Sequence, residues 1–171
     1  MKIYAIVKYP DPILTTPAAP VASFADAELR QLVEDMFATM KEANGVGLAA
    51  PQIGIGKRLT VIDCSGGEDP SQRLVLLNPE VIRKEGKQTG EEGCLSLPGF
   101  RADVTRARAV TVRAQNLEGE WFEASGEELL ARAIQHEVDH LNGVLFISHL
   151  STLKRDLIKR KIRKMQKEGE W

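Results

Sequence analysis

The stretch of residues 125–143, SGEELLARAIQHEVDHLNG, has the most regular apolar pattern of the chain and carries two of its histidines. Apolar side chains recur in it at three- and four-residue spacing, which predicts an amphipathic helix that ends near Asn142 and Gly143. Ser125 followed three residues later by Glu128 predicts a capping box at the start of this helix. The apolar stripe consists of Leu130, Ala133, Ile134, Val138 and Leu141.

Two of the three histidines of the chain lie on this predicted helix. His136 and His140 are four residues apart, so both imidazoles project from one helix face and can reach one metal ion. The carboxylate of Glu137 is then close enough to accept a proton from water at that ion without being a ligand. The HEVDH spacing therefore predicts metal-dependent hydrolysis. His149 has no such neighbours and is expected to face solvent or to be satisfied structurally.

A catalytic ion usually takes three protein ligands, so a third donor must come from elsewhere in the chain. Some HExxH proteases place another histidine six residues after the second, but here that position is Phe146. Others use a glutamate later in the chain, and the only two glutamates after Glu137, which are Glu168 and Glu170, lie in a basic tail. The remaining candidate is Cys94, within EEGCLSLPGF. A thiolate with two imidazoles suits Zn²⁺, Fe²⁺, Co²⁺ or Ni²⁺ without choosing among them.

Another conspicuous segment is GVGLAAPQIG, residues 45–54. It lacks the Lys-Ser/Thr pair of a phosphate-binding loop and no strand precedes it, which argues against phosphate. A backbone strip of this kind lets a substrate approach closely. The side chain of Gln52 then offers an amide donor to developing negative charge.

The rest of the chain predicts an α+β fold, with antiparallel strands packed around the histidine-bearing helix. An N-terminal amphipathic helix is expected between Asp26 and Asn44, after a strand-like start and a proline-rich irregular arm at residues 10–20. Asn116–Gly119 predicts a hairpin turn. The predicted strands are LTVID (59–63), RLVLLNP (73–79), VIRKEG (81–86), AVTVRAQN (109–116) and EWFEA (120–124).

Charge separates the tail from the body. Residues 151–171 carry eight Lys or Arg against three acidic residues, or +5, which leaves −6 for residues 1–150 in a chain of net charge −1. The sequence thus predicts a single catalytic domain, residues 1–150, followed by a basic amphipathic helix, residues 151–171. That helix is either a solvated surface element or a segment that docks on ribosomal RNA through phosphate contacts.

Composition excludes several classes of protein. With 43% apolar and 27% charged residues, the chain is neither disordered nor collagen-like. Two cysteines are too few for a secreted disulfide framework, and Cys64 is expected to be a half-buried hydrophobe. No apolar stretch approaches the roughly 20 residues needed to span a bilayer. These features favour a cytoplasmic protein with no membrane contact.

Three segments, GVGLAAPQ, EGCLS and HEVDH, resemble in order and spacing the signature motifs of the peptide deformylase family. The resemblance implies hydrolysis of the formyl group from the N-terminal formyl-methionine of new polypeptides. It also implies one divalent ion, Fe²⁺ in the cell, which Zn²⁺, Ni²⁺ or Co²⁺ can replace. By this resemblance the metal ligands are Cys94, His136 and His140, the general base and acid is Glu137, and the oxyanion donors are Gln52 and the N–H of Leu95.

Further residues are expected to line an extended peptide site for nascent formyl-methionyl chains, with no other protein subunit required. Two alternatives remain at this point. One is a metalloprotease of another HExxH family, and the other is a non-catalytic metal-binding or ribosome-binding module with a structural ion. The residues expected at the peptide site are Val46, Gly47, Glu92, Gly93, Arg101 and Ala133.

Overall fold

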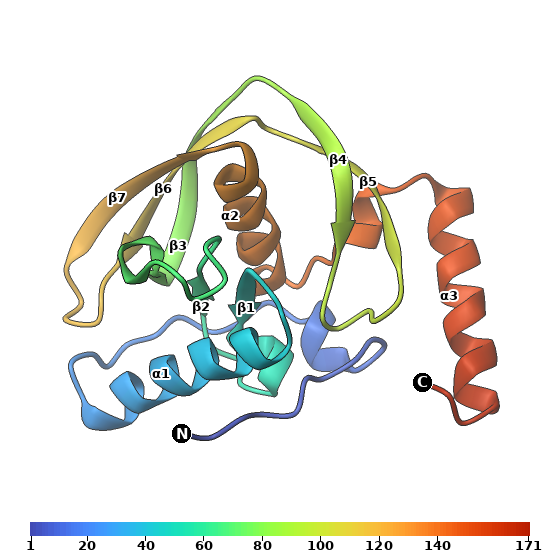
Figure 1. Cartoon of the computed structure of the whole chain (residues 1–171), viewed down its shortest axis with the longest axis horizontal. Helices are drawn as coiled ribbons and strands as arrows, with labels where there is room; N and C mark the ends of the chain where they lie inside the picture. Colours follow the sequence, from blue (N-terminus) through green and yellow to red (C-terminus); the bar gives the residue numbers. More distant parts are fainter.

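A computed structural model describes residues 1–171 and has the predicted α+β architecture (Figure 1). All strand pairs in its sheets are antiparallel. The helices are α1 (Ala27–Glu42), α2 (Glu128–Leu141) and α3 (Thr152–Lys167), and the strands are β1 (Gly47–Ala49), β2 (Leu59–Ile62), β3 (Leu74–Glu85), β4 (Gln88–Gly93), β5 (Arg101–Arg106), β6 (Ala109–Gln115) and β7 (Trp121–Glu127).

The strands form two separate sheets. Five of them make one sheet in the order β1-β2-β3-β6-β7, and β4 pairs only with β5. Figure 1 shows α2 between the five-stranded sheet and this β4–β5 hairpin. Strand β1 is therefore an edge of the larger sheet, and the free edge of β4 belongs to the hairpin. The active-site candidates lie where these two units meet at α2.

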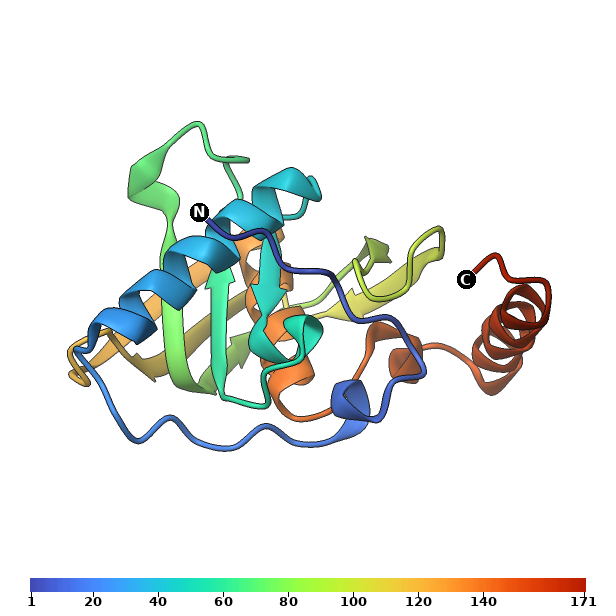
Figure 2. The same ribbon diagram turned by 90° about the horizontal axis from the view of Figure 1, so that it is seen from below.

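Strand β2 is buried on both faces, because helices cover both sides of the sheet at this point. Leu59 and Val61 belong to a core with α1, whereas Ile62 belongs to a second core with Ile134 of α2. This division follows from the alternation of side chains along a strand. Figure 2 shows β1 and β2 between the two helices. A third core joins the β4–β5 hairpin to the segment after α2 and to α3.

The N-terminal helix begins and ends as predicted. The side chain of Asp26 accepts a hydrogen bond from the N–H of Leu29 at 2.7 Å, which satisfies one of the free donors of the first turn. The helix ends at Glu42, just before Asn44, which has a positive φ of 57°. The apolar face of α1 packs against β1 and β2.

The predicted capping box of α2 is wrong. Ser125 lies in β7, where its hydroxyl pairs with that of Thr111 on β6 at 2.8 Å. Pairing between the two strands continues to Glu127, so the helix begins directly after the strand without a side-chain cap. Glu128 takes a positive φ of 52° at this junction. Sheet pairing has overridden the local capping signal.

Other strand predictions need correction too. The runs at 73–79 and 81–86 form the single strand β3, with a shift in register at Asn78 and Pro79 where the proline lacks a ladder donor. The first ten residues form no sheet strand, although the N–H of Val7 donates to the carbonyl of Gln52. Strands β1, β4 and β5 are absent from the predicted strands.

Helix α3 packs on the body through one side only. Ile162 is 1% exposed and belongs to the third core, but Leu153 and Leu157 are exposed. After the helix, Trp171 packs edge-on against Phe100. None of the helices is long and apolar enough to span a membrane. The division into a catalytic domain, 1–150, and a separate helix, 151–171, stays a prediction.

We expect Ile162→Ala to lower the free energy of unfolding by about 2–5 kcal/mol, because it opens a cavity where α3 meets the third core. Leu153→Ala on the same helix is the matched control, since Leu153 is 71% exposed and its truncation should change stability by no more than about 0.5 kcal/mol. Urea unfolding of the two variants beside the wild type measures both effects. Equal destabilisation would show that α3 is not anchored at Ile162.

Candidate metal centre and active site

Two parts of the chain bring the three predicted metal donors together. Cys94 directly follows β4, and His136 and His140 lie on one face of α2. Their donor atoms all lie within 4.8 Å of one another. The Sγ of Cys94 is 3.4 Å from Nε2 of His140, which in turn is 3.1 Å from Nε2 of His136. One sulfur and two nitrogens therefore converge on a single point.

The chemistry of these donors fits a divalent cation. Burial lowers the pKa of His140 well below its usual value, so its ring is neutral and its Nε2 lone pair is available. Burial alone would also lower the pKa of His136, but its contacts with Cys94 and Glu92 raise it to about 10. The surroundings of His136 thus favour a positive charge beside the Cys94 sulfur. A metal ion can supply that charge in place of a proton.

Glu92 borders the cleft as expected, but its carboxylate points inward to the metal site. It is 5% exposed, and its Oε1 accepts from Nδ1–H of His136 at 2.9 Å, since a carboxylate can only accept. This bond fixes the tautomer that leaves Nε2 of His136 free to face the other two donors. Glu92 was expected at the peptide site, and the structure shows that its side chain contacts His136.

Two buried arginines hold the Glu92 carboxylate. Arg106 donates to both of its oxygens, at 2.6 and 2.9 Å, and Arg132 donates to Oε2 at 2.6 Å. Although burial alone would raise the pKa of Glu92, its bonds to His136 and Arg106 hold that pKa far below the usual range. Glu92 therefore stays ionised throughout the ordinary pH range. No local pattern indicates this cluster, because a sequence does not reveal which carboxylates face the interior.

Arg106 continues the network to the far side of α2. Its Nη1 donates to Asp139 at 2.9 Å, and Nε2 of His149 lies 2.8 Å from the same Asp139 oxygen. His149 is thus satisfied structurally, one of the two outcomes expected for it. Asp139 is the fourth residue of the HEVDH motif, so the motif also carries an ion-pair partner beside the two histidines.

Gln52 lies beside the metal donors in a fixed orientation. It belongs to a short 3₁₀ turn, Ala50–Ile53, and its Oε1 accepts from the N–H of Ala49 at 2.9 Å. This bond turns Nε2 toward Oγ of Ser96 at 3.2 Å and Sγ of Cys94 at 3.6 Å. Nearby, the backbone N–H of Leu95 donates to no group of the protein. Two donors that can meet a developing negative charge therefore flank Cys94.

The side chain of Glu137 lies against the backbone of β1. A Cβ on Gly47 would be 2.6 Å from Oε2 of Glu137, so only glycine permits this approach. The other oxygen, Oε1, is buried without a hydrogen-bond partner. Burial raises the pKa of Glu137 to about 7, which allows it to gain or lose a proton near neutral pH.

A cleft of about 600 Å³ opens above these groups, between the start of β1 and the end of β4. All six residues expected at a peptide site border it. Ala133 is buried at its base and Val46 is exposed at its rim. Arg101 is largely exposed and pairs with Glu91, so it does not point at the metal donors. The cleft is also bordered by Leu129 and Phe100, which were not expected there.

An α+β fold in which a His-Glu-His helix faces a cysteine has the parts of a metal-dependent hydrolase. The particular family follows from comparison with known proteins. A family model for polypeptide deformylase matches residues 3–156, and the chain belongs to this family. Its members remove the N-formyl group from newly made polypeptides.

Full-length relatives and solved structures agree with this assignment. The chain is 66% identical to a peptide deformylase of Acidobacterium capsulatum over 171 residues, which is 100% of both chains. It is similar to the crystal structure of a peptide deformylase from Legionella pneumophila, with 47% identity, a TM-score of 0.90 and 98% of each chain covered. A plant peptide deformylase structure gives 37% identity and a TM-score of 0.91, covering 99% of this chain and 92% of its own.

We expect Gly47→Ala to lower turnover of a formyl-peptide by about a hundredfold, because the added methyl displaces the Glu137 carboxylate and a general base at this position would contribute a factor of that order or more. Formate release by the purified protein measures the effect. Gly56→Ala is the control, since a Cβ there meets nothing within 4 Å. Full activity of Gly47→Ala would mean that Glu137 does not need its position against β1.

Glu92→Gln should weaken metal retention about 10- to 100-fold, because the amide no longer holds His136 with a charged acceptor. It should also destabilise the fold by about 3–5 kcal/mol, since Arg106 and Arg132 lose their shared buried counter-charge. Dialysis against a chelator with metal analysis, and urea unfolding, measure the two effects.

Glu91→Gln is the neighbouring control, because its exposed ion pair with Arg101 contributes little. The difference in the free energy of unfolding between wild type and Glu92→Gln should become smaller as the pH falls below about 4. A carboxyl whose pKa is depressed by folding contributes stability above its ordinary pKa and loses that contribution as it becomes protonated. A difference that does not change with pH would contradict the ionised buried state of Glu92.

Proposed function

We propose that this chain hydrolyses the formyl amide of N-terminal formyl-methionine on new polypeptides, releasing formate, at one divalent ion held by Cys94, His136 and His140. The observation that carries this proposal is the convergence of three donor atoms within 4.8 Å, beside the buried carboxylate of Glu137. Membership in the deformylase family supports the choice of substrate.

The residues around the donors then have separate roles. A divalent ion bound here would lower the pKa of water and draw electrons from the formyl carbonyl. Glu137 takes the proton from the attacking water through its unpartnered Oε1, and later delivers it to the leaving amine nitrogen. Nε2 of Gln52 and the N–H of Leu95 donate to the oxyanion, where each such donor lowers the barrier by about 3–4 kcal/mol.

The peptide would lie in the cleft as an added strand. β1 and β4 present unpaired edges there, and main-chain hydrogen bonds to Val46 and Gly93 would accept many sequences. Ala133 is small and lies one turn before His136, so it leaves space for a methionine side chain near the donors. Gly47 lets the bound peptide pass close to Glu137. Arg101 borders the peptide site at the exposed rim of the cleft.

We assign Fe²⁺ as the ion in the cell, with Zn²⁺, Ni²⁺ or Co²⁺ able to replace it. One thiolate and two imidazoles suit all four metals, so geometry alone does not select one. The proposed setting is the cytoplasm, where new polypeptides emerge and where thiols stay reduced. No second protein subunit is required, because one chain provides every residue named above.

Formate release from formyl-Met-Ala-Ser by anaerobically purified protein, with metal analysis of the same sample, tests the proposal. Glu137→Gln should keep its metal and lose about 10²- to 10⁴-fold in turnover. Cys94→Ser should lose both metal and activity. Retained metal and activity in Cys94→Ser would overturn the ligand assignment, and an unchanged rate in Glu137→Gln would indicate a structural ion. Cleavage within unformylated peptides would favour another protease family.

We also propose that the exposed basic face of α3 docks on ribosomal RNA. Deleting the helix would remove Ile162 from the third core, so charge substitution is the better test. A triple variant, Arg160→Gln, Lys161→Gln and Lys164→Gln, should weaken co-sedimentation with ribosomes and flatten its salt dependence. The control removes the same charge elsewhere, at Lys2, Lys57 and Arg83. If both variants behave like wild type, α3 is a solvated surface helix.

A further inference from the structure

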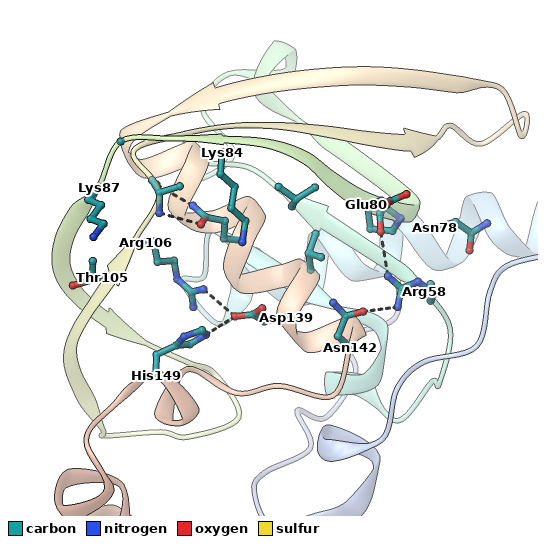
Figure 3. A pocket seen from close by; sticks show the side chains of 16 residues that line it. Arg58, Asn78, Glu80, Lys84, Lys87, Thr105, Arg106, Asp139, Asn142 and His149 are labelled. Carbon is teal, nitrogen blue, oxygen red and sulfur yellow. Dashed lines mark hydrogen bonds and ion pairs between the residues drawn. The ribbon is translucent and has the colours of Figure 1, made fainter.

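A second groove lies on the side of α2 that faces away from the metal donors (Figure 3). We call it the Arg58 groove. It has a volume of about 780 Å³, within the range of small-ligand sites, and its walls come from β3, the end of β5 and α2. Gln135, Val138 and Asp139 of α2 border it, as does Asn142 directly after the helix, whereas Ala133, His136 and Glu137 border the substrate cleft.

Arg58 provides a fixed cation at one end of this groove. Its guanidinium donates to the carbonyls of Leu141 and Pro79 and to the side chain of Asn142, at 3.0 to 3.1 Å. These acceptors carry no formal charge, although the end of α2 contributes a partial negative one. No carboxylate lies within 4 Å, and partial burial lowers the pKa of Arg58, so its charge is not fully compensated. Two of its five N–H donors remain free.

Two lysines add to this charge. Lys84 and Lys87 form no ion pair, and Figure 3 shows Lys84 between Lys87 and Arg58. Among the acidic residues of the groove, Asp139 is already paired with Arg106 and His149, so only Glu80 remains unpaired. The groove therefore carries a net charge of about +2 in a body whose residues 1–150 sum to −6. Such a local reversal of charge attracts anions.

From these contacts we infer that the Arg58 groove binds a small polyphosphate-type anion. Three separated cations match an anion with several charged groups better than one with a single charge, and arginine and lysine are the usual partners of phosphate oxygens. The free Nδ2 of Asn142 adds a neutral donor, because only its Oδ1 is taken by Arg58. No Phe, Tyr or Trp borders the groove, so nothing there favours a nucleobase.

Titration of inorganic tripolyphosphate into nickel-loaded full-length protein, followed by amide chemical shifts, tests this inference. We expect shifts at Lys84, Gly86 and Asn142, and weaker binding of inorganic phosphate. Lys84→Gln and Lys87→Gln should each raise the dissociation constant about tenfold, the loss expected for one charged hydrogen bond. Metal analysis after the titration ensures that the anion has not extracted the nickel.

Arg83→Gln is the matched control, because Arg83 directly precedes Lys84 in β3. It is exposed and pairs with Glu85 outside the groove. It should leave the dissociation constant unchanged. Equal weakening by Arg83→Gln would reveal general attraction rather than a site and would overturn the inference. Absence of tripolyphosphate binding, shifts confined to α3 or to the Cys94 region, or binding of an RNA oligonucleotide but not of tripolyphosphate would overturn it as well.

Discussion

The buried carboxylate of Glu92 ties the β4–β5 hairpin to α2 and so sets the geometry of the site. The hairpin β4–β5 shares no strand pairing with the larger sheet, so its placement against α2 relies on contacts between side chains. Glu92 supplies the charged contacts among them, since it comes from β4 and binds Arg132 and His136 of α2 together with Arg106 of β5. Burying one anion between two cations avoids the several kcal/mol that an unpaired ion would cost. The same contacts bring Cys94, two residues later, to the histidines.

A part of this arrangement could be predicted from the sequence, because it depends only on the spacing of residues within one helix. The i, i+4 histidines and the apolar stripe of α2 lie within one helix, so periodicity alone places them together. Cys94 comes from a distant segment, and only elimination and the family resemblance indicated it. The inward direction of the Glu92 side chain depends on partners 14 and 40 residues away along the chain. No local pattern encodes such partners.

The wrong predictions have a common physical cause, which is tertiary contact overriding a local signal. Ser125 has the residue type and spacing of a cap, but its strand pairs with β6 up to the first turn of the helix. β1 has a glycine where a strand former is expected, because Glu137 occupies the space of a side chain. The charged strand β5 shows little apolar alternation, since Arg106 is one of its two buried residues.

The three hydrophobic cores described above meet at the proposed metal site. Leu95 packs on the core of α1, Ala133 belongs to the core between α2 and the sheet, and Cys94 packs on the core that holds α3. An ion bound between Cys94 and the histidines thus joins residues anchored in two different cores. Its binding energy adds to the cohesion between cores, which would otherwise depend on side-chain contacts across their boundaries. Loss of the ion would then loosen the junction between cores before the interior of any one of them.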